Sequence, residues 1–319
     1  MSSLIRRYGS LFPSKPPSLK PSASSATRPL EEALALRLRS LLPIPGNSPG
    51  VPLPWLHRAV RILALTLAAT AALVSDRSLP GGVDSDALTA HLDAGVPFLD
   101  ACNAASAEIA RLVHRLLPLR VALRLLHPDD DDGDENALRQ ARRAIAEWQS
   151  TPSREIGWSG GELIRRMAPD EPPRGSASAV RRATYAAESV SRLVMAAVLA
   201  MIGGGEGKAL LSKIRVSGEW PWAEAFNEVA AAVSGRLRAA LPGELVAVEA
   251  AVRRLAGVID EETEGLGTAV EAVEIATEEL TVGLDGLTDG VNGAFHAAMG
   301  TRNAALNSLR RGHGRRGCT

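Results

Sequence analysis

The chain has 319 residues, enough for one large domain or two small ones, and its formal net charge is zero. It contains two cysteines, too few for a disulfide-stapled secreted fold, and only 3% of its residues are aromatic. Ala, Leu and Val dominate its apolar residues, and since Ala and Leu lose little side-chain freedom in a helix, the composition favours an all-α fold over a sheet.

The amino-terminal residues 1–28 carry Arg6, Arg7, Lys15, Lys20 and Arg28 but no acidic residue, and they are rich in Ser and Pro. Without hydrophobic periodicity, such a stretch is expected to be a flexible tail. The same composition is typical of an organelle transit peptide. We therefore expect a cytoplasmic protein, with import into chloroplasts as the alternative.

Residues 29–311 are expected to form the helical domain, and residues 312–319 a flexible basic tail.

Helical periodicity follows in a series of segments separated by Pro- and Gly-rich linkers. The predicted helices are Leu30–Leu42, Trp55–Val74, a long segment from Asp84 or Ser85 towards His127 with disturbances at Pro97 and Pro118, Asn136–Gln149, a short helix near Glu162–Met167, Ser178–Ile202, Trp220–Leu241 and a last segment opened by Pro242. The uncharged apolar stretches Ile62–Val74 and Leu193–Ile202 are shorter than the ~18–20 residues that cross a bilayer, although the second could hold a membrane-peripheral protein at a surface.

The last segment contains a sustained seven-residue repeat. Its first column consists of large aliphatic residues, namely Leu245, Val252, Ile259, Leu266, Val273, Leu280 and Leu287, followed by Ala294. The column three residues later ends in small residues: Ala269, Ala276, Gly283, Gly290 and Ala297. This pattern predicts a long coiled-coil-like helix, or a helix pair broken near Gly265, whose small residues admit a close neighbour.

Three stretches that could carry chemistry do not meet the requirements. Gly203–Ala209 reads GGGEGKA and lacks the first Gly and the Ser or Thr of a phosphate-binding loop. The acidic run Asp129–Glu135 places Pro128 and Arg139 at calcium-ligand positions. The six histidines are scattered, and Glu108 has no obvious second carboxylate for acid–base work. We therefore expect no catalytic, cofactor-binding or metal-binding residue, and no enzyme.

Several stretches resemble one plant family. PWLHRAVRIL and FLDACNAASAEIARL resemble the Trp-led helix and the Cys-Asn segment of the BYPASS-related family, and VSGEWPWAEAFNEVAAAVSGRL resembles its Trp-Ala-x-x-Phe-Asn segment. The long carboxy-terminal helix ending in TRNAALNSLR completes a resemblance that covers roughly residues 30–311. The Asp100–Glu108 and Trp222–Asn227 segments are its most specific parts.

The resemblance implies a plant regulator of growth and development, similar to proteins that restrain a root-derived mobile signal arresting shoot growth. A related branch of the family is associated with the exocyst, which makes an exocyst subunit a candidate protein partner and a membrane-peripheral adaptor the alternative function. We expect no nucleic-acid partner and no cofactor. The candidate partner-binding residues are Trp220, Trp222, Phe226, Asp100, Asn103 and Glu108. For the Trp pair the competing interpretation is core anchoring, and for the polar cluster it is a solvated face or an internal hydrogen-bond set.

Overall fold

The structure is a computed structural model. It describes residues 23–46, 50–79, 83–126, 135–152, 160–169, 172–174, 177–203, 207–237, 241–261 and 265–316. These residues form eleven α-helices and no strand, which confirms the predicted all-α fold. The helices are α1 (Ala23–Arg39), α2 (Leu53–Ser75), α3 (Ser85–Arg115), α4 (Leu117–Leu125), α5 (Glu135–Ser150), α6 (Gly160–Arg166), α7 (Ala179–Ile202), α8 (Gly207–Leu211), α9 (Ala223–Arg236), α10 (Gly243–Glu261) and α11 (Leu266–Arg316).

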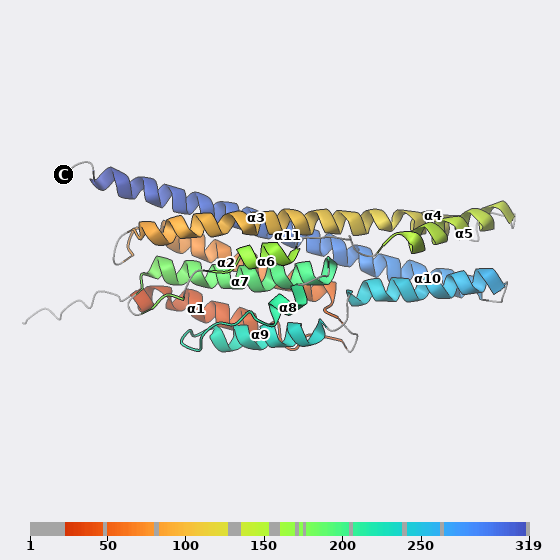
Figure 1. Cartoon of the computed structure of the whole chain (residues 1–319), viewed down its shortest axis with the longest axis horizontal. Helices are drawn as coiled ribbons and strands as arrows, with labels where there is room; N and C mark the ends of the chain where they lie inside the picture. The colour runs from red at the N-terminus through yellow and green to blue at the C-terminus, as the bar shows by residue number, and fades with distance from the viewer. Residues whose placement is uncertain are drawn as a thin grey trace, which may run out of the picture.

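The molecule is elongated, and the long helices α3 and α11 run along most of it (Figure 1). At 1.5 Å per residue, the 51 residues of α11 span about 75 Å. One half of the molecule stacks α1, α2, α7 and α9 beside α3 and α11, whereas the other end contains the α4–α5 and α10–α11 hairpins. A single large apolar core joins these elements, with α7 at its centre: Ala179–Ile202 contains an unbroken buried run from Leu193 to Ile202.

The small residues of the repeat bring α11 close to α2. A methyl group added at Gly283 would approach Leu53, and one added at Gly290 would lie 3.2 Å from Cδ2 of His57. A side chain at either position would push the two helix axes apart, so the glycines allow α2 and α11 to pack closely. Among the described helices, this pair has the most extensive contact. The predicted close neighbour of the small-residue column is therefore α2.

The large-residue column lies in the core on both sides of a chain reversal. Val252, Val273 and Leu280 are at most 1% exposed, whereas Leu266 beside the reversal is only partly buried. Gly265 has φ = 110°, a conformation that glycine adopts without steric cost, and it separates α10 from α11. The second of the two predicted arrangements, a helix pair broken near Gly265, is the one that the structure adopts.

Several expected boundaries differ from those observed. Residues 23–28, expected in the flexible tail, form the first turns of α1, because Thr27 is buried and receives a hydrogen bond from Arg182 Nε at 3.1 Å. Residues 312–316, also expected to be flexible, continue α11. The helix predicted over Trp220–Leu241 is shorter, since α9 begins only at Ala223. The acidic run Asp129–Asp134 and residues 1–22 lie outside the described residues.

Two described helices, α2 and α7, are long and apolar enough to cross a membrane. In α7, 89% of the apolar window is buried within the protein, against 44% in α2. The stretch Leu193–Ile202, suggested above as a membrane-facing segment, is therefore a core element whose apolar side chains are already covered by other helices.

Candidate functional site

The aromatic residues of the Trp-Ala-x-x-Phe-Asn segment form a cluster in the core. Trp222 and Phe226 are fully buried, with ring centroids 5.6 Å apart in an edge-to-face arrangement. Tyr185 of α7 contacts both tryptophans, with centroids 5.5 Å from Trp220 and 6.1 Å from Trp222. The structure thus brings together three of the six candidate residues, but it places them inside the protein, as the core-anchoring interpretation predicts.

Asn227 fixes the turn that precedes this cluster. Its side-chain Oδ1 accepts a hydrogen bond from the Val216 backbone N–H at 3.0 Å, and its Nδ2 donates to the Val216 carbonyl at 2.8 Å. One side-chain amide therefore replaces both backbone partners that Val216 would have in a regular element. This segment therefore packs the start of α9 against Tyr185 of α7 and holds the preceding turn in place through Asn227.

A buried ion pair borders the aromatic cluster. Arg182 of α7 donates from Nη2 to both carboxylate oxygens of Glu31 in α1, at 2.7 and 2.9 Å, and its guanidinium carbon lies 4.7 Å from the Trp220 ring centroid. The Glu31 side chain is only 2% exposed. A buried carboxylate needs such a partner to offset its desolvation. The two residues are 151 positions apart in the sequence, so local periodicity gives no signal for this pair.

The polar candidates on α3 do not form one cluster. Asp100 lies at the surface, 3.4 Å from Nη2 of Arg166 in α6, and Asn103 is exposed. Glu108 points inward and is 2% exposed, and both its oxygens accept hydrogen bonds from Arg111. Glu108 therefore belongs to an internal hydrogen-bond set, as its competing interpretation predicts, whereas Asp100 and Asn103 lie on the surface and remain candidate partner-binding residues.

That internal set attaches α5 to α3. Arg111 Nη1 donates to the Pro152 carbonyl at 3.0 Å, and Arg115 Nε donates to the Thr151 carbonyl at 3.0 Å. The Arg115 guanidinium also lies 4.3 Å from the centroid of the buried Trp148 ring. Glu108 therefore orients Arg111, which holds the carboxyl end of α5.

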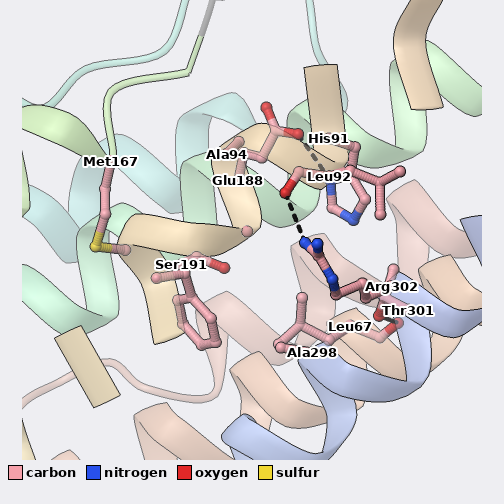
Figure 2. Close-up of a pocket in the computed structure, with 12 residues that line it drawn as sticks. Leu67, His91, Leu92, Ala94, Met167, Glu188, Ser191, Ala298, Thr301 and Arg302 are labelled. Carbon is pink, nitrogen blue, oxygen red and sulfur yellow. Dashed lines mark hydrogen bonds and ion pairs between the residues drawn. The ribbon is translucent and has the colours of Figure 1, made fainter. Parts of the chain in front are cut away.

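A small pocket with a mostly apolar lining and a few polar side chains lies where α2, α3, α7 and α11 meet, and Figure 2 shows the residues that line it. His91 Nδ1 and Glu188 Oε1 are 2.8 Å apart and join α3 to α7. Arg302 Nη1 donates to the Leu92 carbonyl at 3.0 Å and joins α11 to α3 (Figure 2). Thr301 Oγ1 donates to the Leu67 carbonyl at 3.1 Å, which adds α2 to the same junction.

The pocket combines an imidazole, a carboxylate and a guanidinium, but it has room for little besides water. Its cavity of about 40 Å³ corresponds to about three water molecules. Ser191 lines it one helical turn after Glu188, yet among the described residues no hydrogen bond joins Ser191 to His91. The arrangement therefore ties four helices together, and it lacks the hydroxyl–imidazole contact that activates a serine nucleophile.

Cys102 adds no reactive group. It is 1% exposed, and burial raises the pKa of its thiol to about 12. A thiol in this state is protonated at neutral pH and behaves as a small apolar side chain. Within the part of the chain that the structure describes, no three His, Cys, Asp or Glu side chains are grouped as metal ligands would be.

The chain is thus an elongated all-helical protein. Of its six candidate residues, Asp100 and Asn103 lie at the surface, and the other four serve internal packing. In sequence it is 30% identical to each of two proteins called UPF0496 protein 4, from the japonica and indica subspecies of rice (Oryza sativa), over 268 residues that cover 76% of this chain. It is 28% identical over 207 residues, or 62% of its length, to a protein of Arabidopsis thaliana called Protein BPS1, chloroplastic.

The chain spans 57% of the length of each of these relatives. No family model matches it, and no solved structure does. These comparisons confirm the resemblance described above: the chain is a homologue of the rice UPF0496 proteins and of the Arabidopsis protein BPS1.

Proposed function

We propose that the protein is a non-enzymatic regulator of plant growth and development that acts stoichiometrically, by binding other proteins. The observation that carries the proposal is its relationship to the Arabidopsis protein BPS1 over 62% of the chain. What the family resemblance implies about shoot growth and a root-derived signal is extended to this chain on that basis.

The arrangement of polar groups supports a binding role over a catalytic one. Glu108, Glu31 and Arg182 are committed to internal ion pairs, and the polar junction around His91 has a cavity of about 40 Å³. An enzyme that acts on small molecules generally uses a pocket of roughly 300–1,000 Å³ that encloses its substrate, whereas the hollows of that size beside α11 are open at the surface. The long outer faces of α3, α4 and α11 offer helix surfaces for a partner instead.

The family association with vesicle tethering makes an exocyst subunit the first partner to test. We propose a cytoplasmic location with peripheral membrane contact through that partner. The Arabidopsis relative is named as a chloroplastic protein, which motivates the alternative of import into chloroplasts. A fluorescent fusion of residues 1–60 discriminates between the two, because a transit peptide directs it into chloroplasts and a plain basic tail leaves it in the cytosol.

The test of the function is complementation. The full chain is expressed in a plant that lacks its relatives, and shoot growth is scored together with the amount of soluble protein. Rescue that rises in proportion to protein level supports stoichiometric action, whereas full rescue at trace levels favours a catalyst. Absence of any rescue at normal protein levels contradicts the developmental role.

A further inference from the structure

A groove runs between α4 and α11 at the end of the molecule that carries the two helical hairpins. Arg120 and Leu123 form its α4 wall, and the α11 residues from Glu274 to Thr281 form the other, around a volume of about 520 Å³. A second hollow of about 410 Å³ continues between α3 and α11, from Ser106 to Leu117 on one wall and Thr288 on the other. Because Thr281 and Thr288 are seven residues apart on one side of α11, the two hollows follow the same helix face.

Large apolar side chains are exposed on the helices that form the two hollows. Ile275 lines the first hollow and Leu117 the second, and Val282 and Val121 lie further along the same two helices. Ile275 and Val282 of α11 are 55% and 60% exposed, and Leu117 and Val121 of α4 are 45% and 54% exposed. The α11 pair is separated by seven residues and the α4 pair by four, so each pair shares one helix face. Four of the eight large hydrophobic residues exposed in the described chain thus lie on the two helices that form the groove.

The α11 side of the groove is strongly acidic. Between residues 267 and 301 the helix carries six acidic residues and no Lys or Arg: Glu271, Glu274, Glu278, Glu279, Asp285 and Asp289. None of the six forms an ion pair with another described residue. The α4 wall contributes Arg120, which donates a hydrogen bond to Thr281, and Arg124, so the groove as a whole remains negative.

One buried hydroxyl in the groove also lacks a partner. Thr277 lines the groove and is 5% exposed, and its Oγ1 makes no hydrogen bond within the described structure. Buried hydroxyl groups are normally satisfied, so an unsatisfied one marks a place where a further polar group can be accommodated. This observation is independent of the surface charge and coincides with the acidic part of the groove.

We propose that this groove is the docking site for a basic amphipathic helix of a partner protein. Its apolar face would cover Ile275, Val282, Leu117 and Val121, and its Lys or Arg side chains would pair with Glu274, Glu278 and Glu279. An amphipathic helix laid in an apolar groove is a common mode of peptide recognition, and complementary charge orients it. The inference rests on the proposed binding function, because it names the chemistry of the partner.

The test uses the full chain and a labelled peptide of about 18 residues, which matches the length of the Glu271–Asp289 face. The peptide places Leu on one helical face and Lys on the other, and it carries a photoreactive group. Controls are the same Leu pattern with Glu in place of Lys, and a scrambled Leu/Lys peptide. We expect micromolar binding of the amphipathic basic peptide alone, and cross-links that map to α4 and α11.

Two pairs of variants separate the charge from the apolar surface. The double variant Glu274→Lys/Glu278→Lys should weaken binding by about tenfold. Its control is Glu219→Lys/Glu228→Lys, which changes one exposed acid before α9 and one on it, and binding should then change less than about twofold. The double variant Ile275→Ser/Val282→Ser should also weaken peptide binding by about tenfold. Its control, Leu36→Ser/Leu65→Ser, changes a similarly exposed pair on α1 and α2 and should leave peptide binding unchanged.

Cross-links elsewhere, or equal losses in the groove and control variants, would overturn the proposal. Dimerisation of the full chain that the groove variants abolish would assign the groove to a second copy. Peptide affinity that rises by about tenfold when residues 1–22 are removed would assign it to this chain's own basic segment. Failure of the wild type to rescue growth while the peptide maps to the groove would reject the developmental role and leave the docking site standing.

Discussion

Leu53 and Gly283 oppose each other across the α2–α11 contact, and a Cβ at Gly283 would lie 2.8 Å from Cδ1 and 2.9 Å from Cβ of Leu53. The second distance matters most, because the Leu53 Cβ cannot move away by a change of rotamer. Gly283 is therefore required by packing, even though glycine in a helix interior is less favourable than alanine by about 1 kcal/mol.

Gly283→Ala should lower the free energy of unfolding by about 1–2 kcal/mol, since the steric cost exceeds the gain in helix propensity. Gly293→Ala is the matched control on the same helix, because nothing lies within 4 Å of its added Cβ. That variant should be stabilised by up to about 1 kcal/mol. Urea unfolding followed by circular dichroism measures both, and a stabilised Gly283→Ala would contradict the close approach of α2.

Removal of Glu31 should be far more damaging than removal of its neighbour Glu32. Glu31→Ala leaves the Arg182 guanidinium partly buried without its carboxylate, which should cost about 3–5 kcal/mol of unfolding free energy. Glu32 pairs with Arg28 at an exposed site, so Glu32→Ala should cost no more than about 1 kcal/mol. Equal effects in thermal melts would show that α1 is not anchored through Arg182.

The sequence predicts the helices and much of the core of this protein because both depend on local periodicity. The column containing Val252, Val273 and Leu280 is buried as its spacing indicates, and Asp84 caps α3 by accepting from the Ala87 N–H at 3.0 Å. Helix capping and seven-residue spacing require information from only a few neighbouring residues.

The side-chain chemistry was less accessible, because it joins residues distant in sequence. His91 and Glu188 are 97 residues apart, and neither stands out in a local motif. The aromatic segment is distinctive in the sequence, but its packing depends on Tyr185 in another helix. Periodicity indicated that Gly283 and Gly290 admit a neighbour, whereas only the fold identifies that neighbour as α2.

Trp222 should matter to stability before it matters to binding. Trp222→Ala removes a fully buried ring from contact with Phe226 and Tyr185, and it should cost about 3–5 kcal/mol. The exposed residue Asn103, from the other candidate group, is the comparison: Asn103→Ala should change stability by less than about 0.5 kcal/mol. Denaturant titration of both variants decides the matter, and an unchanged midpoint for Trp222→Ala would restore a purely binding role for that residue.

Cys102 should be almost inert while the protein is folded. Burial raises the pKa of its thiol from 9.0 to about 12, and the thiolate is the reactive form. At pH 8 the difference in pKa alone should slow alkylation by about 10³-fold relative to the unfolded chain. Iodoacetamide labelling with peptide mass spectrometry, in buffer and in urea, measures the Cys102 rate in each state. A native rate close to the unfolded rate would contradict its burial.

The same pKa shift determines how stability should vary at alkaline pH. The folded state holds the Cys102 proton more tightly than the unfolded state, whose thiol has a pKa near 9.0. The resulting stabilisation is fully present below pH 9 and is lost as the pH rises towards 12. Burial also raises the pKa of Tyr185, which adds a loss of the same sign. Cys102→Ala should therefore show a shallower decline in unfolding free energy above pH 9 than the wild type, and an identical decline would assign the alkaline limb to Tyr185 and other groups.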